Sequence, residues 1–467
     1  EVRNYSSSVI RNEKFYGKKG ISWKRITSGT SSLTVLDEGL IFDQSADSLF
    51  VNEDIPFYEI LGYLNCKVSK KYLNLYSPTM NLTSGTVCDL PIFKTESVII
   101  SNLAEENEII TRQNILSEEL SPKYLSDELI RINGQDLEET FDLYQQYWRN
   151  KFFQLHKNEE ELNRQFIEIY GLQDELTPDV PLEDITILKD ETSIVNGQLV
   201  FNANEVFAQF MSYAVGCMFG RYSLDKEGLI LANQGETVED YLVKIGTSTT
   251  LSDLSFVPDE DNIIPILDDE WFEDDIVARF HKFLKVTFGE ANFSKNLAFV
   301  EEQLGKDIRK YFTKDFYSDH IKRYKKRPIY WMFSSPKGSF NVLIYMHRYT
   351  PDTVSNILNK YLREFSGKLK TRLETLEHIK VSGTASEKTK AIKESDAIDK
   401  MLIDLHEYER DILYPIATER IAIDLDDGVL VNYNKFGKAI KEVAGLNDKA
   451  TKKKVKGFDW IDVTQIR

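Results

Sequence analysis

The chain has 467 residues, of which 42% are hydrophobic and 28% charged, and its formal net charge is −17 at pH 7. This apolar content excludes an intrinsically disordered protein. The sequence has no apolar run near the roughly 18 residues of a membrane-spanning helix, and its three cysteines lack disulfide or zinc spacing. We therefore expect a folded cytoplasmic protein that makes no contact with a membrane.

The negative charge is concentrated in one segment. Residues 174–275, the acidic segment, contain 23 acidic and 4 basic residues, so they carry −19 and leave +2 for the rest of the chain. Exposed charges more than about 8–10 Å apart are largely screened at physiological salt, so a cationic surface can coexist with this segment. The net charge therefore does not exclude a nucleic-acid-binding protein.

The first predicted elements are strands. Apolar and polar residues alternate near residues 21–26, 33–35 and 40–42, with turn signals between them. This pattern predicts a small β-meander.

Cationic and aromatic residues surround the first predicted strand. Arginine can pair with guanine, tryptophan can stack on a base and lysine can neutralise phosphate, so this edge suits contact with DNA. The candidate DNA-contacting residues are Lys18, Lys19, Trp23, Lys24, Arg25 and Ser28. The alternative is that Trp23 belongs to the core and that the cations are solvated.

A helix is predicted over about residues 57–72, where apolar residues recur at helical spacing on one face. Lys67, Lys70 and Lys71 are grouped on the adjoining face, and we assign them to DNA contact as well. A solvated helix face is the alternative interpretation.

The middle of the chain is predicted to be largely helical. Residues 102–173 have the three- and four-residue apolar spacing of packed helices. The acidic segment contains one strongly apolar helix at residues 206–219 and a loop at 257–265. Helices resume from 275 to 326.

The densest positive charge follows these helices. It comprises Lys322, Arg323, Lys325, Lys326 and Arg327. This cluster suits the DNA backbone. Pairing with the acidic segment explains it equally well.

Mixed structure is predicted at the C-terminal end. Two strands at 329–333 and 340–345 are joined by residues 334–339, which form a hairpin connection rather than a phosphate loop, because P-loop spacing is missing. A helical hairpin with a narrow apolar seam is predicted at about 351–414. A turn and strand at 424–431 precede a lysine-rich tail.

These elements predict an α+β fold in three domains. They are a small β-rich domain at 1–100, a largely helical region at 101–326 that includes the acidic segment, and a mixed domain at 327–467. We assign no catalytic residue or metal ligand, because Asp319-His320 has no identifiable nucleophile nearby and Asp424 to Asp427 lacks the EF-hand glutamate position.

Several blocks resemble a known family. The order WKRITSG, GLIFD, ILGYLNCKVSKKYL, SPTMNL and CDLPI is similar to the target-recognition domain of amino-type DNA adenine methyltransferases. Residues 213–235, 327–349 and 423–437 resemble the C-terminal half of PglX, the adenine-specific methyltransferase of BREX phage-defence systems. The resemblance covers nearly the whole chain.

The resemblance implies that this chain recognises double-stranded DNA within a site-specific adenine-N6 methyltransferase. The sequence has neither the Asn/Asp-Pro-Pro-Tyr/Phe motif nor a Gly-rich strand-to-helix turn for S-adenosylmethionine. In the family these motifs lie upstream, so we expect no cofactor in this chain and S-adenosylmethionine in a missing N-terminal half. The chain alone is then expected to bind DNA without methylating it.

A second hypothesis is a protein-interaction scaffold. The acidic segment and the helical hairpin would dock other proteins of a BREX complex, and DNA contact would be secondary.

Overall fold

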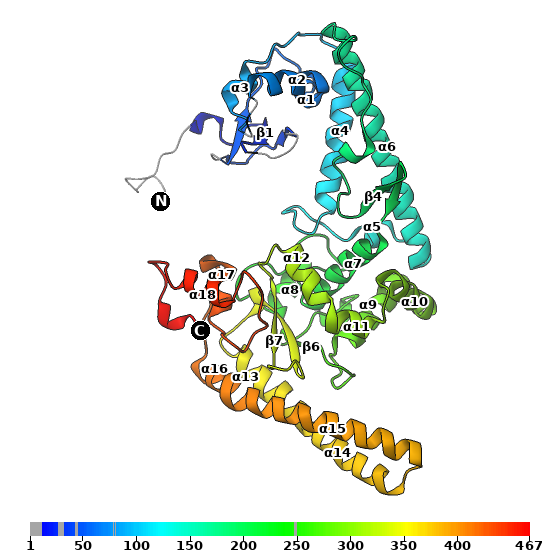
Figure 1. The fold of residues 1–467 in the computed structure, drawn as a ribbon, viewed down its shortest axis with the longest axis vertical. Coiled ribbons are helices and arrows are strands. Elements are labelled where there is room, and N and C mark those ends of the chain that lie inside the picture. The colour runs from blue at the N-terminus through cyan, green and yellow to red at the C-terminus, as the bar shows by residue number, and fades with distance from the viewer. Residues whose placement is uncertain (1–11, 27–31, 43–44, 78, 80, 247–249) are drawn as a thin grey trace. The chain divides into compact units, whose positions relative to one another are not determined.

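The computed structural model describes residues 12–26, 32–42, 45–77, 79, 81–246 and 250–467. The chain forms two compact units: unit 1 contains residues 1–116 and 145–201, and unit 2 contains residues 117–144 and 202–467. Helices dominate, and the sheets among the described residues are small and antiparallel, which confirms the α+β class (Figure 1).

The two units do not follow the predicted domain borders. The border predicted at residue 100 lies inside unit 1, and the border predicted at residue 327 lies inside unit 2. The acidic segment contributes residues to both units. The division into three domains stays a prediction.

Unit 1 combines one small sheet, one hairpin and long helices. Its strands are β1 (Gly20–Lys24), β2 (Thr34–Leu36), β3 (Ala46–Leu49), β4 (Thr192–Val195) and β5 (Gln198–Phe201). Its helices are α1 (Phe57–Asn65), α2 (Lys67–Tyr76), α3 (Ser84–Cys88), α4 (Val98–Ser117) and the greater part of α6 (Leu137–Ile169). Ile21, Trp23 and the apolar faces of α1 and α2 belong to one core.

The predicted β-meander is wrong in its order and in its third strand. The strand order is β2-β1-β3, so β1 lies in the centre. Residues 40–42 are not a strand: Leu40 pairs with Gly17 through one backbone hydrogen bond, and Ile41 is 74% exposed. The preceding turn is fixed by Asp37, which accepts two hydrogen bonds from Arg112, so the chain re-enters the sheet only at Ala46.

The predicted helix at 57–72 is two helices. Cys66 is extended, with φ −77° and ψ 167°, and separates α1 from α2. The side chain of Asn65, at the end of α1, exchanges hydrogen bonds of 3.0 and 2.9 Å with the backbone of Leu33. This contact connects the end of α1 to the residue before β2. Helix α1 ends at this contact instead of continuing into α2.

Unit 2 is built around a buried three-stranded sheet. The strands are β6 (Ile264–Pro265), β7 (Tyr330–Ser334) and β8 (Asn341–Tyr345), in the order β6-β8-β7. Residues 439–441 pair with the other edge of β7, where the Lys441 amide donates to the Met332 carbonyl at 2.8 Å. Every residue of β7 is buried, so helices and loops cover both faces.

Helices surround this sheet. They are α5 (Glu128–Ile132), α7 (Ala203–Met218), α8 (Val238–Ile245), α9 (Ile276–Phe288), α10 (Phe293–Leu304), α11 (Ile308–Lys314), α12 (Phe316–Arg323), α13 (Thr353–Asn356), α14 (Arg363–Ser382), α15 (Ala385–Tyr408), α16 (Tyr414–Glu419), α17 (Gly428–Asn434) and α18 (Lys449–Val455). The apolar helix predicted at 206–219 is α7, and the two strands predicted after Pro328 are β7 and β8.

The helical hairpin predicted at about 351–414 is confirmed. Helices α14 and α15 lie side by side (Figure 1), and their buried apolar residues include Leu369, Leu376 and Ile398. At the base of the hairpin, residues Ile357–Leu362 and Glu409–Leu413 are π-helical. The strand predicted at 424–431 is wrong, because this segment is a 3-10 turn followed by α17, whose Val431 packs against Val455.

Among the described residues, none of the helices is both long enough and apolar enough to cross a membrane.

Candidate nucleic-acid interface

The end of β1 presents two cations to solvent. Lys24 and Arg25 are exposed, and among the described residues neither side chain has an ion pair or hydrogen-bond partner. The strand alternates, so that Ile21 and Trp23 enter the core while Lys24 points away from it. Within the described part of the chain, both cations are therefore available to an anionic ligand.

A second segment lies beside these cations. The amide of Leu82 donates to the Arg25 carbonyl at 2.8 Å, and Ile26 forms a β-bridge with Asn81. The Ser77 hydroxyl donates to the Asn81 carbonyl at 2.8 Å and so closes the turn after α2. We define the β1 surface as Lys24, Arg25, Ile26, Thr79 and Asn81, all exposed.

Trp23 supports this surface from below. It is only 3% exposed, and its indole N–H donates to the Leu82 carbonyl at 2.9 Å. Stacking on a base needs an exposed ring face. Trp23 therefore belongs to the core, which was the alternative to its predicted contact with DNA. Its indole joins β1 to the segment that carries Asn81.

Lys18 and Lys19 are exposed but lie over aromatic rings of unit 1. The Lys19 ammonium is 4.5 Å from the centroid of Phe57 and 4.8 Å from that of Tyr58, and Lys18 is 5.8 Å from that of Phe15. Such cation–π contacts leave the charge accessible to a phosphate. Ser28 lies outside the described residues.

The lysines of α2 are engaged within unit 1. The Lys67 ammonium donates to the carbonyls of Thr177 and Asp179, and Lys71 forms an ion pair with Glu175. These contacts hold the first residues of the acidic segment against α2. Lys70 is half-buried beside them, so the DNA role of this group stays a prediction.

The basic cluster after α12 is divided. Arg323 is half-buried and pairs with Glu205 at 3.2 Å. Glu205 belongs to the acidic segment, so this contact is the pairing predicted as the alternative to DNA binding. Lys322, Lys325, Lys326 and Arg327 are exposed. The contact of these four residues with the DNA backbone stays a prediction.

The turn after α12 has an unusual backbone. Lys325 and Lys326 have φ values of 50° and 62°, which non-glycine residues rarely adopt. His320 holds this turn, because its Nε2 accepts the amides of Ile329 and Tyr330, each at 3.1 Å. Burial lowers the pKa of His320 well below its usual value, so it is a neutral acceptor and not a general base.

The β7–β8 connection is a hairpin turn whose donors are already used. The buried carboxylate of Asp404 accepts the Ser335 hydroxyl at 2.6 Å and the amides of Lys337 and Ser339 at 3.1 and 3.3 Å. The protein's own carboxylate thus occupies the position that a phosphate would take, which supports the hairpin interpretation.

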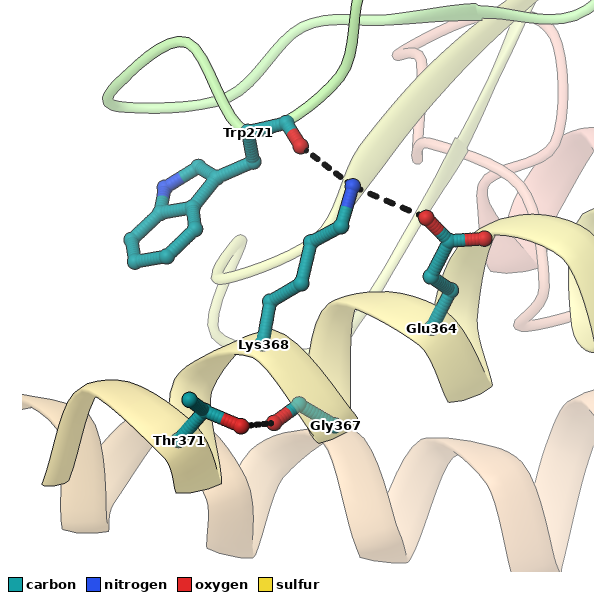
Figure 2. A pocket seen from close by; sticks show the side chains of 5 residues that line it. All are labelled: Trp271, Glu364, Gly367, Lys368 and Thr371. Atoms are coloured by element: carbon teal, nitrogen blue, oxygen red, sulfur yellow. Dashed lines mark hydrogen bonds and ion pairs between the residues drawn. The ribbon is translucent and has the colours of Figure 1, made fainter. Parts of the chain in front are cut away.

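A hollow in unit 2 does not resemble a cofactor site. It measures about 510 Å³ and lies beside α14, lined by Trp271, Glu364, Gly367, Lys368 and Thr371 (Figure 2). The Lys368 ammonium donates to the Trp271 carbonyl at 2.7 Å and pairs with Glu364 at 2.8 Å. Its main charged groups therefore satisfy each other instead of converging on a ligand.

The absence of an S-adenosylmethionine site in this chain stays a prediction. The described strands pair antiparallel, and the connection between β5 and α7 is the single residue Asn202, which is not a glycine-rich turn. Within the same residues, no group of three histidine, cysteine or acidic side chains is arranged to hold a metal ion.

Sequence reasoning missed the exposed polar residues of the segment 77–82. The signal was present, because SPTMNL is rich in turn-forming residues and follows a helix. Its position beside Arg25 depends on the Leu82 hydrogen bonds, which no local pattern shows.

Comparison with curated proteins identifies relatives over nearly the whole chain. An adenine-specific methyltransferase named BrxX, from Escherichia coli O9:H4 (strain HS), is 32% identical over 461 residues, which are 94% of this chain and 38% of the relative. The adenine-specific methyltransferase PglX of Lacticaseibacillus casei (strain Zhang) is 34% identical over 441 residues, which are 91% of this chain and 35% of the relative. The chain therefore resembles part of PglX.

The PglX-like chain thus spans little more than a third of the length of these two relatives. No protein-family model matches it.

Proposed function

We propose that this chain is the DNA-recognition portion of a PglX-like, site-specific adenine-N6 methyltransferase of BREX phage defence. Its relatives are adenine-specific methyltransferases, and it covers only part of their length. The methyl donor and the flipped adenine would then be bound by residues outside this chain.

The free cations of the β1 surface carry this proposal. Lys24 and Arg25 are exposed and unpaired among the described residues, whereas the lysines of α2 and Arg323 are held by acidic or carbonyl groups of the same chain. A bound phosphate would therefore not have to displace an internal ion pair from the β1 surface. Arg25 and Asn81 also provide donors and an acceptor for base edges.

The test removes both charges. In a Lys24→Gln/Arg25→Gln variant we expect weaker binding of duplex DNA by fluorescence anisotropy, and a slope of log K against log salt that is smaller by about 0.9 for each phosphate no longer neutralised. Lys157→Gln/Arg164→Gln is the control of equal charge change, because both residues are exposed on α6 in unit 1; Arg164, unlike Arg25, forms ion pairs with Glu161 and Glu168. Equal affinity and slope in the two double variants would refute the recognition role of the β1 surface.

The same variant tests the enzymatic context. Joined to the remainder of the polypeptide, the Lys24→Gln/Arg25→Gln variant should lose methylation of adenine in its target site while S-adenosylmethionine still binds. Unchanged methylation would place recognition elsewhere.

A scaffold function is the second candidate, and one observation favours it. Val381, Ile392 and Ile403 on α14 and α15 are exposed by 79%, 50% and 53%. Apolar side chains along a helical hairpin suit another protein of the defence complex. Val381→Ser/Ile392→Ser should reduce recovery of BREX proteins in a pull-down, whereas deletion of the whole hairpin would also remove Asp404, which caps the β7–β8 turn.

A further inference from the structure

The C-terminal part of unit 2 carries a second concentration of positive charge. Residues 438–462 contain seven lysines and four acidic residues. The α18 surface, as we define it, consists of Lys438, Lys449, Lys452, Lys453, Lys454 and Lys456. Among the described residues, no carboxylate lies within ion-pair distance of any of these six ammonium groups.

The arrangement on α18 opposes the stability of the helix. Lys449, Lys452 and Lys456 follow one another at three- and four-residue spacing and so share a face, where like charges destabilise a helix by about 0.2–0.5 kcal/mol per pair. Partial burial lowers the pKa of Lys452. The negative charge of Glu442 raises this pKa, whereas the positive charges of Lys438 and Lys456 lower it further. The lysines are therefore close enough to repel one another.

Two acidic residues of this segment serve as helix caps and form no ion pair with the lysines of the α18 surface. Asp448 caps α18, because its carboxylate accepts the amides of Gly445, Ala450 and Thr451. Asp462 caps the next 3-10 turn through the amide of Thr464. A lysine in the last helical turn interacts favourably with the helix dipole, but this effect falls off within that turn and does not account for Lys438 or Lys449.

An exposed aromatic residue follows the lysines. Trp460 is 62% exposed, and its ring stacks on Phe458 with 5.7 Å between the centroids. Phe458 in turn packs against the small core of Val431, Val455 and Ile466, which anchors α18. A large apolar ring is therefore exposed to solvent shortly after Lys456 in the sequence.

The α18 surface continues into the exposed cations of the α12–β7 turn. A Cβ atom on Gly445 would lie 3.2 Å from Cδ and 3.4 Å from the ammonium of Lys326, so the Lys326 side chain runs over Gly445. Gly445 donates to Asp448, the cap of α18. Lys326 thus extends the cationic surface from the turn to the start of the helix.

From this geometry we propose that the α18 surface, with Trp460, binds the sugar–phosphate backbone of duplex DNA independently of sequence. The proposal rests on the proposed function, since it takes DNA as the polyanion. Helix α18 is roughly 10 Å long, so its lysines span several phosphates of a duplex that carries one charge per about 1.7 Å. Lysines at phosphates position a protein without reading bases.

The test uses the whole 467-residue chain. In the variant Lys452→Gln/Lys453→Gln/Lys454→Gln/Lys456→Gln, we expect the salt slope of duplex binding to fall by about 0.9 for each phosphate that the protein no longer neutralises, up to about 3.6. Affinity should fall by the same factor for a duplex with the target site and for a scrambled one. The matched control replaces Lys388, Lys390, Lys393 and Lys400 of α15 by Gln. Binding of the α18 variant equal to that of this control would overturn the proposal.

Two further measurements separate the possible failures. If the α18 variant still binds DNA like wild type but loses binding to vesicles of anionic lipid, the surface is a membrane contact and the proposal is wrong. If Lys24→Gln/Arg25→Gln binds normally while the α18 variant does not, the recognition surface fails and the α18 proposal stands.

Trp460 provides a readout that does not depend on charge. Three of the other tryptophans, Trp23, Trp148 and Trp331, are at most 3% exposed, so acrylamide quenching reports mainly on Trp460 and the half-buried Trp271. Duplex DNA should reduce quenching in wild type and have a smaller effect in Trp460→Phe. An equal effect of DNA on both proteins would remove Trp460 from the interface.

Discussion

Individual buried acceptors decide whether a donor-rich loop is available to a ligand. Asp404 is fully buried and takes the hydroxyl and two amides of the β7–β8 turn, and His320 takes two amides at the start of β7. Both residues connect distant parts of unit 2 through backbone donors. An aspartate and a histidine suggest catalytic roles when only the sequence is known, but the contacts of these two residues stabilise the fold.

Replacement of Asp404 should destabilise unit 2. Asp404→Ala leaves the buried Ser335 hydroxyl without its acceptor, which costs about 1–3 kcal/mol, and also removes the acceptor of the partly buried amides of Lys337 and Ser339. We expect a lower urea midpoint for this variant. Asp399→Ala is the control, because Asp399 is exposed on the same helix and should change the midpoint little. Equal midpoints would show that Asp404 does not hold the turn.

Single helices in unit 1 depend on partners from distant parts of the sequence. Helix α2 has no side-chain cap of its own, and Asn163 of α6 accepts the Lys67 amide at its N-terminus at 2.8 Å. The same Asn163 amide donates to the Pro178 carbonyl at 3.2 Å. One residue of α6 therefore fixes both α2 and the beginning of the acidic segment.

Asn163→Ala should loosen this connection. Asn163 is buried, so its removal leaves the Lys67 amide and the Pro178 carbonyl unsatisfied at a cost of about 1–3 kcal/mol. We expect faster proteolysis near residues 174–179. Lys71→Gln is the comparison, because it removes only the partly exposed ion pair with Glu175, worth about 0–1 kcal/mol. If Lys71→Gln accelerated cleavage more than Asn163→Ala, the ion pair and not the buried amide would hold the segment.

Buried titratable groups of opposite sign affect the stability of the whole molecule. Burial, reinforced by Arg221, lowers the pKa of His347 from 6.5 to about 4. Burial raises the pKa of Asp127 from 3.8 to about 7. The unfolded chain binds more protons at His347 between pH 6.5 and 4, whereas the folded chain binds more at Asp127 between pH 4 and 7.

Stability should therefore depend on pH in opposite directions for two variants. As pH falls from 6.5 to 5, His347 destabilises wild type by roughly 2 kcal/mol relative to His347→Gln, because only the unfolded state gains the proton. As pH rises from 4 to 7, Asp127 destabilises wild type relative to Asp127→Asn, because the folded carboxyl must ionise in a buried site. Thermal midpoints of the three proteins at pH 5 and pH 7 measure both effects. A constant difference between wild type and His347→Gln would contradict the first.

The sequence by itself determined the elements with long, regular patterns and the family resemblance. The helical hairpin and the apolar helix α7 have helical apolar spacing, and β7 and β8 are apolar runs bounded by turn residues. The similarity to BrxX and PglX covers nearly the whole chain.

The tertiary structure alone decided which of the candidate cations are free. Lys67, Lys71 and Arg323 look like Lys24 and Arg25 in the sequence, but carbonyls and carboxylates from distant segments hold them. The order of the first sheet and the break at Cys66 likewise accompany contacts between distant segments, such as the hydrogen bonds between Asn65 and Leu33. A local pattern records which side chains are cationic or apolar, and only the folded chain determines which partners reach them.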